Sequence, residues 1–305
     1  MFKHPTDSYE PLRKRVPPHP HTWRKPGQHG TVGRVTGQDF DVWTAGDAYE
    51  RYMGRWSRLV ADEFVAWLEC APGARWLDVG CGSGALTSAV ARQCRPRTLL
   101  GVKRSAGYVA AAREHRPPLT LFSRADAQAL PLGEAAVDVA VSGLVLNFLP
   151  APGAAVAEAA RVVAPGGLVA AYVWDYAEGM GFLRHFWDAV TAVDPSSAAQ
   201  LDEGRRFPLC RPGPLRRLWS EAALAEAEVV PIEVPTRFAD FADLWDPFLA
   251  GQGPAPGYVA SLAPAARERL RETLRERVPD RADGSIALRA RASGVRGRRA
   301  GVVER

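Results

Sequence analysis

The chain has 305 residues, of which 47% are hydrophobic and 24% are charged, the proportions of an ordinary soluble globular protein. Its net charge of +5 comes from the two ends, because residues 1–38 and residues 289–305 carry +5 each and the segment between them carries −5. An acidic body excludes the basic groove that a nucleic-acid enzyme needs, and no run approaches the roughly 18 apolar residues that span a bilayer. We therefore expect a cytoplasmic protein that binds neither nucleic acid nor membrane.

The cysteines do not form a metal-binding or disulfide pattern. Cys70, Cys81, Cys94 and Cys210 show no CxxC spacing, and the N-terminus has no apolar stretch of signal-peptide length. We expect reduced thiols and no bound metal.

The first part of the chain changes character near residue 47. Residues 1–38 are rich in Pro, His and Gly, which predicts a disordered basic N-terminal arm. The run DAYERYMGRWSRLVADEFVAWLEC that follows spaces apolar residues three and four apart, including Tyr52, Trp56 and Phe64, which predicts one or two amphipathic helices.

From Arg75 to Trp174, apolar runs alternate with helical ones. The predicted strands are RWLDVG, TLLGV, LTLFS, VDVAVSGL and GLVAAYVW, and the predicted helices are SGALTSAVARQC, AGYVAAAREH and GAAVAEAARVVA. Such alternation predicts an α/β fold, a parallel sheet with helices on both faces. Because the strand runs are continuously apolar, we expect both faces of this sheet to be buried.

After Trp174 the alternation stops. Residues 179–278, approximately, read mainly as helices, which predicts a helical cap inserted late in the chain. The run GSIALRARASGV alternates enough to predict an antiparallel edge strand, and residues 295–305 are expected to be a basic tail.

The stretch RWLDVGCGSGALT is the most informative in the sequence. An apolar strand ends in glycines, which allow a sharp turn and let a ligand approach the backbone, and the next helix presents its free N–H groups there. Two nucleoside cofactors are compatible with such a turn.

The first is a nicotinamide dinucleotide. Gly80, Gly82 and Ala85 satisfy G-x-G-x-x-G/A, and Lys103 and Arg104 could bind the 2′-phosphate of NADP. Asp78 argues against this cofactor because an acid there would repel a pyrophosphate. Gly84 is a further glycine that the fingerprint does not require, and no tyrosine is followed by a lysine four residues later.

The second is S-adenosylmethionine, whose amino acid head makes the same acid favourable. A carboxylate at Asp78 can support the ammonium group of that ligand, while backbone N–H groups bind its carboxylate.

Four segments in this order resemble the successive motifs of class I S-adenosylmethionine-dependent methyltransferases, in particular the methyltransferase type 11, or ubiquinone-biosynthesis-like, small-molecule group. They are LDVGCGSG, ADAQALP, VDVAVSGLVLNFL and RVVAPGGLVAAYVWD. The resemblance covers roughly residues 45–294, and we expect residues 39–294 to form the methyltransferase domain. It implies a Rossmann-like, seven-stranded, mostly parallel sheet and a methyl transfer with S-adenosylmethionine as the cofactor.

The resemblance also assigns cofactor-binding roles. It implies that Gly80, Cys81, Gly82 and Gly84 surround the methionyl part, which Asp78 orders, and that Asp126 accepts from the adenine amino group while Ala127 donates its backbone N–H. Ser142 and Leu144 would flank the methyl-donating end.

One position departs from the family. The second strand usually ends there in an acid that accepts both ribose hydroxyls, and the run LLGVKRSAGY places Lys103 on it, next to Arg104. Each missing charge-assisted hydrogen bond is worth about 1.5 to 3 kcal/mol, so we expect a roughly 10 to 1,000-fold weaker cofactor site. Three alternatives remain open: weakened but real binding, a non-catalytic pseudoenzyme, and another adenosine-containing ligand.

The remaining site residues are predicted from their position around the mouth of the sheet. Aromatic and polar side chains there could hold an acceptor, and Asp175 is the candidate for a catalytic base. The candidate substrate-binding residues are Tyr49, Tyr52, Trp56, Asn147, Trp174 and Tyr176. The expected reaction is in-line methyl transfer to a small molecule by a monomer or homodimer, and a pseudoenzyme or an NADP-dependent oxidoreductase are the alternatives.

Overall fold

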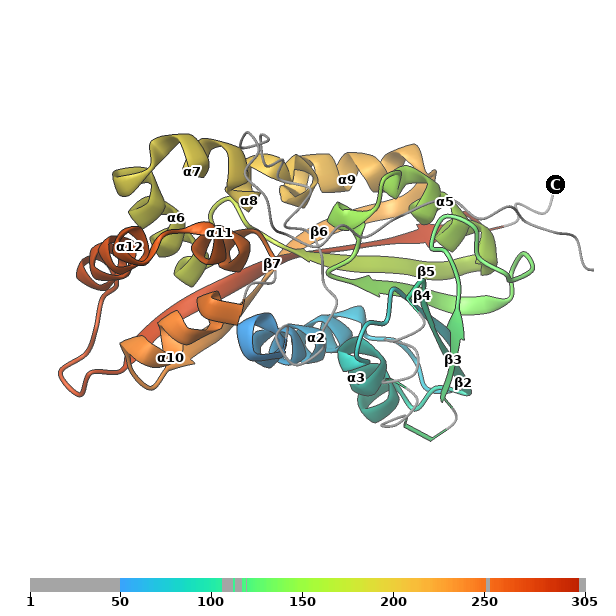
Figure 1. The fold of residues 1–305 in the computed structure, drawn as a ribbon. Helices are drawn as coiled ribbons and strands as arrows, with labels where there is room; N and C mark the ends of the chain where they lie inside the picture. Colours follow the sequence, from blue (N-terminus) through green and yellow to red (C-terminus); the bar gives the residue numbers. More distant parts are fainter. Residues whose placement is uncertain (1–49, 106–111, 113–116, 119, 251–252, 302–305) are drawn as a thin grey trace, which may run out of the picture. The chain divides into compact units, whose positions relative to one another are not determined.

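The computed structural model describes residues 50–105, 112, 117, 118, 120–250 and 253–301 (Figure 1). The arm expected for residues 1–38, most of the helix expected near residues 106–116, and residues 302–305 of the expected tail lie outside this part of the chain. Within it, no helix is long and apolar enough to cross a membrane.

A seven-stranded sheet forms the centre of the fold, in the order β3-β2-β1-β4-β5-β7-β6. Every neighbouring pair from β3 to β5 is parallel, and β7 runs antiparallel to both β5 and β6. The expected Rossmann-like α/β fold with a mostly parallel sheet is thereby confirmed. The strands are β1 (Arg75–Val79), β2 (Thr98–Lys103), β3 (Thr120–Arg124), β4 (Val137–Gly143), β5 (Val163–Trp174), β6 (Leu224–Phe238) and β7 (Ile286–Arg299).

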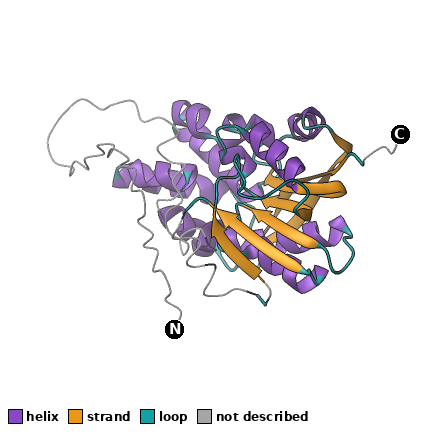
Figure 2. Cartoon of the chain, turned by 90° about the vertical axis from the view of Figure 1, so that its right-hand side faces the viewer, coloured by secondary structure: helices purple, strands orange, loops and turns teal. Residues whose placement is uncertain are grey.

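Helices cover both faces of the sheet, as Figures 1 and 2 show. On one face lie α2 (Arg55–Leu68) and α3 (Ala85–Cys94), and on the other lie α5 (Pro152–Val162) and α9 (Pro212–Glu221). A short π-helix, η2 (Glu50–Gly54), precedes α2, so the amphipathic run forms two consecutive helices. The continuous apolar strands are buried between these layers, as the sequence predicts.

The antiparallel strand is present, but its expected position at the sheet edge is wrong. β7 lies between β5 and β6, so β6 forms that edge of the sheet. β7 also continues to Arg299, so residues 295–299 lie in the sheet and not in a tail. The alternating polar residues that predicted an edge strand are arginines. Acidic residues on neighbouring strands neutralise their charge: Arg296, for example, donates to Glu228 at 2.9 Å.

The segment predicted to form the cap contains helices and one strand of the sheet. Short helices pack together beyond the carboxyl ends of the parallel strands, while β6 joins the sheet (Figure 1). A stacked pair of rings, Phe186 and Phe248, centres this packing with centroids 4.4 Å apart. The elements are α6 (Gly181–Val193), α7 (Pro195–Leu201), α8 (Glu203–Arg206), η4 (Pro208–Cys210), α10 (Phe241–Trp245), η5 (Asp246–Ala250), α11 (Pro254–Ser261) and α12 (Pro264–Arg277).

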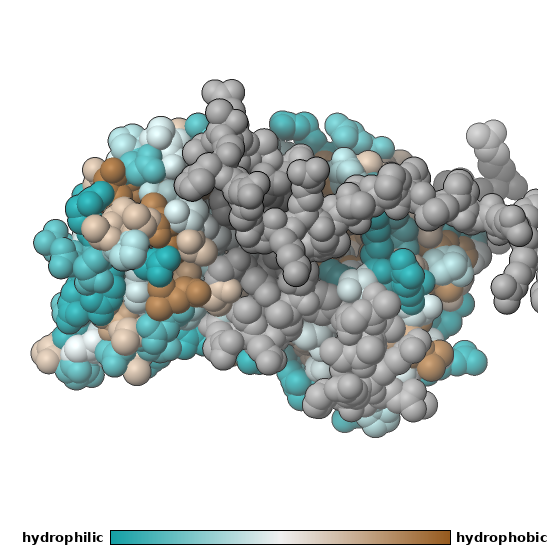
Figure 3. Space-filling view, viewed as in Figure 1, coloured by the Kyte–Doolittle hydropathy of each residue, from teal (hydrophilic) through white to brown (hydrophobic). Residues whose placement is uncertain are grey.

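The surface of the described residues mixes hydrophilic and hydrophobic side chains. On the face seen in Figure 3, brown residues form small separate spots among teal ones. Large hydrophobic side chains that are exposed include Leu59, Leu121, Val193 and Leu249, which lie on different elements. The described part of this face therefore shows no broad apolar area.

Candidate active site

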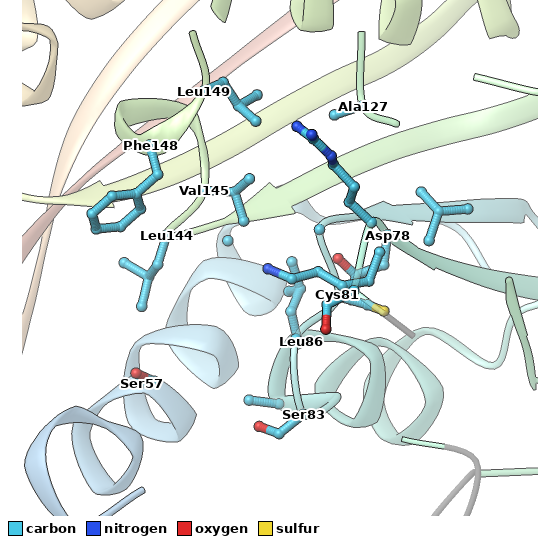
Figure 4. A pocket seen from close by; sticks show the side chains of 18 of the residues that line it. Ser57, Asp78, Cys81, Ser83, Leu86, Ala127, Leu144, Val145, Phe148 and Leu149 are labelled. Carbon is cyan, nitrogen blue, oxygen red and sulfur yellow. The ribbon is translucent and has the colours of Figure 1, made fainter. Parts of the chain in front are cut away.

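A cavity of about 340 Å³ opens at the carboxyl ends of the parallel strands. It lies where the strand order reverses, with β1 between β2 and β4, and open α/β sheets bind their ligands at such a point. Figure 4 shows side chains from three places around it: Asp78 on β1 with Cys81 and Leu86 after it, Leu144, Val145 and Phe148 after β4, and Ser57 on α2.

The glycine turn after β1 forms one wall. Gly80, Gly82 and Gly84 have φ angles of +83°, +52° and +92°, a region that side chains disfavour. A Cβ on Gly80 would lie 2.5 Å from Val145 Cγ2, so glycine is also required for space. Gly80 and Cys81 donate their N–H groups to the Val102 carbonyl at 2.7 and 3.1 Å, which fixes the turn against β2. Gly80, Cys81 and Gly82 line the cavity, and Gly84 begins α3 behind them.

Asp78 places a buried carboxylate in the same wall. Its Oδ2 accepts from the Thr87 hydroxyl at 2.5 Å, and its Oδ1 has no hydrogen-bond partner among the described residues. Burial raises the pKa of Asp78 to about 6, against the lowering effects of Thr87 and Lys103. A buried carboxylate oxygen without a partner would be satisfied by a cationic ligand group, so this wall fits the ammonium of S-adenosylmethionine.

Two cations lie at the end of β2, where the resemblance predicts an acid. Lys103 is the last residue of β2, and Lys103 and Arg104 both line the cavity. Burial lowers the pKa of Lys103, while the charges of Cys81 and Asp78 raise it. The structure therefore brings the unusual lysine to the cofactor cavity, facing the same space as Asp78.

The loop after β3 supplies the next part of the lining. Asp126 and Ala127 both line the cavity, and Ala125 donates its N–H to the Lys103 carbonyl at 3.2 Å, which joins this loop to β2. Hydrogen bonds from the backbone and side chain of Gln128 lower the pKa of Asp126. Asp126 is thus held as an anion where an adenine amino group could donate to it.

The two residues predicted to flank the methyl-donating end are separated by the structure. Leu144 lines the cavity with φ +58° and donates its N–H to Tyr172 O at 2.8 Å. Ser142 is buried outside the lining, where its hydroxyl donates to the Val79 carbonyl at 2.8 Å. Its hydroxyl therefore links β4 to β1.

Only some of the predicted substrate-binding residues line the main cavity. Trp174 and Tyr176 line the cavity, and Trp174 Nε1 is buried with no hydrogen-bond partner in the described part of the chain. Tyr52 lines a second, smaller cavity, and Trp56 packs at 5.4 Å from the Phe238 ring in the core. Asn147 lines neither cavity, and Tyr49 lies outside the described residues.

Asp175, the predicted base, does not line the main cavity. It is buried at the end of β5 and is absent from the lining. Its Oδ2 accepts from Arg291 Nε and Nη2 at 2.9 and 2.6 Å, and its Oδ1 accepts from the Glu178 N–H at 3.2 Å. Through these bonds, Asp175 joins the end of β5 to β7.

Several lining residues were not predicted from the sequence. Met53 and Ser57 from the first helices, Val145 after β4 and Tyr172 on β5 all face the cavity. Met53 and Ser57 lie four residues apart on one helical face, a spacing that also describes a packed core. Among the described residues, no group of His, Cys, Asp and Glu could hold a metal ion, and the four cysteines are free.

Known proteins resemble this chain in sequence and in fold. Residues 77–171 match the methyltransferase domain family. The chain is 32% identical over 130 residues to a trans-aconitate 2-methyltransferase of Methylobacterium nodulans, covering 43% of this chain and 49% of that one. It is 31% identical over 185 residues to an uncharacterized 37.1 kDa protein in transposon Tn4556 of Streptomyces fradiae, covering 58% and 50%. This chain thus spans about half the length of these curated relatives.

Among solved structures, it superposes on phosphoethanolamine N-methyltransferase 2 of Haemonchus contortus in complex with S-adenosyl-L-methionine. The TM-score is 0.52 at 16% identity, over 88% of this chain and 61% of that one, a likeness that concerns the fold alone.

Motif order, sheet order and cavity position thus agree with the class that the sequence resembles, the class I S-adenosylmethionine-dependent methyltransferases. The match of residues 77–171 to the family described as methyltransferase domain confirms the resemblance seen in the sequence.

Proposed function

We propose that this protein transfers the methyl group of S-adenosylmethionine to a small-molecule acceptor. The observation that carries the proposal is the buried Asp78 carboxylate, with Oδ1 lacking a partner among the described residues, beside the glycine turn of the cavity. When bound, this cofactor would supply a sulfonium-activated methyl group: an acceptor atom would attack the methyl carbon in line, and the carbon–sulfur bond would break to release S-adenosylhomocysteine. The trans-aconitate methyltransferase of the similar sequence is named for a small-molecule substrate, which supports an acceptor of that size.

In this function the chain positions the reactants and excludes water. Asp78 would hold the ammonium of the cofactor, the turn that begins at Gly80 would follow its methionyl part, and Asp126 would accept from its adenine amino group. Trp174 and Tyr176 line the cavity and would contact the acceptor. Because the methyl group is already activated, holding the nucleophile within about 3 to 3.5 Å supplies much of the rate, and a base in the protein is not required.

The second candidate is a methyltransferase-like protein with little or no catalysis, and Lys103 is the observation that favours it. A lysine can donate to a ribose oxygen but cannot accept from a hydroxyl, so the usual two bonds to the ribose are absent. A partly buried cation in the cavity would also attract a ligand that carries negative charge near its ribose.

Calorimetric titration of S-adenosylmethionine and S-adenosylhomocysteine into the wild type and Lys103→Asp distinguishes the two. Micromolar binding by the wild type supports the proposed enzyme. Binding by Lys103→Asp alone supports a methyltransferase fold whose cofactor site was lost at one position. No binding by either variant would contradict the cofactor assignment, and titration of NADPH would then test the oxidoreductase alternative.

A further inference from the structure

A second cavity, of about 10 Å³, adjoins the cofactor cavity on the side of the cap helices. Three residues, Met53, Phe148 and Tyr176, line both cavities, so the two share a wall. Its volume is about that of one water-sized group. The complete lining is Tyr52, Met53, Phe148, Tyr176, Leu183, Glu203, Phe207 and Pro254.

Glu203 is the carboxylate in this lining, and it is only 3% exposed. Its Oε2 accepts from Trp187 Nε1 on α6. The charge of Arg184 lowers the pKa of Glu203, but the Arg184 guanidinium donates its hydrogen bonds to both carboxylate oxygens of Asp202. Among the described residues, no ion pair therefore joins Glu203 to a cation.

The position of Glu203 is built by its neighbours. Asp202 accepts from the Gly204 N–H at 2.9 Å and so begins α8. A Cβ on Gly204 would lie 2.8 Å from the Tyr176 carbonyl oxygen, so glycine lets α8 pack directly against the residues that follow β5. This contact brings Glu203 next to Tyr176 at the shared wall.

Burial makes the Glu203 anion costly in the free protein. Burial, together with the Asp202 charge, raises the pKa of Glu203 to about 7, against the lowering effects of a backbone hydrogen bond, the Trp187 hydrogen bond and Arg184. The other titratable groups that face this site are Tyr52 and Tyr176. Burial raises the pKa of Tyr52, and the charges of Glu203 and Tyr176 raise it as well. A cation in the cavity would stabilise the ionised form of Glu203.

Aromatic rings form most of the remaining lining. Tyr52, Phe148, Tyr176 and Phe207 all line this cavity, and Phe207 contacts Phe148 and Tyr176 with centroids 5.3 and 5.6 Å apart. Ring faces attract cations, most strongly where water is excluded. A carboxylate without a cationic partner, surrounded by aromatic rings, has the composition of a site for an ammonium group.

We propose that the acceptor substrate carries a primary ammonium group, which binds to Glu203 among these four rings while the rest of the molecule extends past Phe148 and Tyr176 into the cofactor cavity. A primary ammonium is about as large as a water molecule and fits the second cavity, whereas a trimethylammonium group exceeds it. This inference rests on the proposed methyl transfer and names the substrate class of that same site.

The test is calorimetry on the full chain saturated with S-adenosylhomocysteine. The probes are 2-phenylethylamine, the neutral 2-phenylethanol and trimethyl(2-phenylethyl)ammonium. We expect the wild type to bind the primary amine at least tenfold more tightly than either of the others. In Glu203→Gln, which keeps the size of the side chain and an acceptor for Trp187, that preference should disappear. Glu178→Gln removes a carboxylate that is 82% exposed and should keep it.

A proton count separates a charge interaction from a packing effect. With a pKa of about 7, about half of the Glu203 side chains should be protonated at pH 7, so amine binding should release about half a proton, measured from titrations in buffers of different ionisation enthalpy. From pH 7 to pH 6 the amine affinity should fall about fivefold, because the ionised fraction falls. Glu203→Gln should show neither effect.

Equal affinity of the wild type for amine and alcohol, no binding of the amine, or a preference that survives Glu203→Gln would overturn the proposal. Failure of the proposed function is a different result, because it would appear as the absence of S-adenosylhomocysteine binding before any amine is added. In that case the amine titration of the unliganded protein still decides whether Glu203 binds an ammonium group.

Discussion

Asp78 combines two opposing requirements, because it is buried in the free protein and is expected to meet a cation when the cofactor binds. Its pKa is raised to about 6, above the usual value of an unfolded aspartate, so its charged form costs folding free energy above that pH. Cofactor binding needs the charged form. The affinity for S-adenosylhomocysteine should therefore fall about tenfold from pH 7.5 to pH 5, as measured by calorimetry.

Asp78→Asn is the control for this pH effect. It should bind more weakly at pH 7.5 and show a nearly flat profile down to pH 5. Asp126 does not interfere, because its pKa is lowered and it stays charged over this range. A wild-type profile that Asp78→Asn leaves unchanged would show that another group titrates.

Gly80 allows a second test at the scale of one residue. Gly80→Ala should weaken cofactor binding strongly and lower the free energy of unfolding, because the new Cβ meets Val145 at 2.5 Å in addition to the cost of φ +83°. Gly73→Ala is the matched control: its φ is +87°, but nothing lies within 4 Å of the added Cβ. It should cost about 1 to 2 kcal/mol of stability and leave the affinity unchanged. Equal affinity losses in both variants would contradict the role of the turn.

The site residues that sequence could predict are those with a local signal. A strand that ends in glycines marks Asp78 and the turn, because the geometry they need is encoded within a few residues. Glu203 has no such signal in LDEGRRF. Its burial depends on Trp187, which is sixteen residues away, and on Tyr52, which belongs to the first helices. Such a site exists only once distant elements have packed.

At the scale of elements, the bond between Asp175 and Arg291 joins β5 to β7. Asp175→Asn should lower the free energy of unfolding by about 1.5 to 3 kcal/mol, measured by urea denaturation, because a hydrogen-bonded ion pair is lost. The affinity for S-adenosylhomocysteine should change less than twofold, because Asp175 does not line the main cavity. As the control, Glu233→Gln removes an ion pair with Arg289, which is 79% exposed, and should cost less than about 1 kcal/mol. A stable Asp175→Asn protein that has lost cofactor binding would restore a direct role at the site.

The strands whose burial the sequence could predict are the continuous apolar ones. Continuous apolar sequences predict burial on both faces for β1, β2, β4 and β5, whereas the arginines of β7 predict an exposed edge. Inside the sheet these arginines contact acidic and aromatic side chains from elements that are distant in the sequence. Arg296 lies over the Trp67 ring at 4.5 Å, with Trp67 far away in the sequence on α2. The edge assignment failed because these partners come from distant elements.

At the scale of the molecule, the cap helices and the sheet should unfold together. The described residues from 50 onward form one unit, and β6, which lies within the segment predicted as the cap, is hydrogen-bonded to β7 along its length. Far-ultraviolet and near-ultraviolet circular dichroism should therefore report one thermal transition, since Trp76 in the sheet and Trp187 in the cap are both fully buried. S-adenosylhomocysteine at about 100 times its dissociation constant adds about 2.7 kcal/mol, which should raise this single midpoint by about 5 to 10 °C. Two transitions, of which the ligand moves only one, would mean that the cap folds independently. The ammonium site at Glu203 could then open and close without disturbing the cofactor cavity.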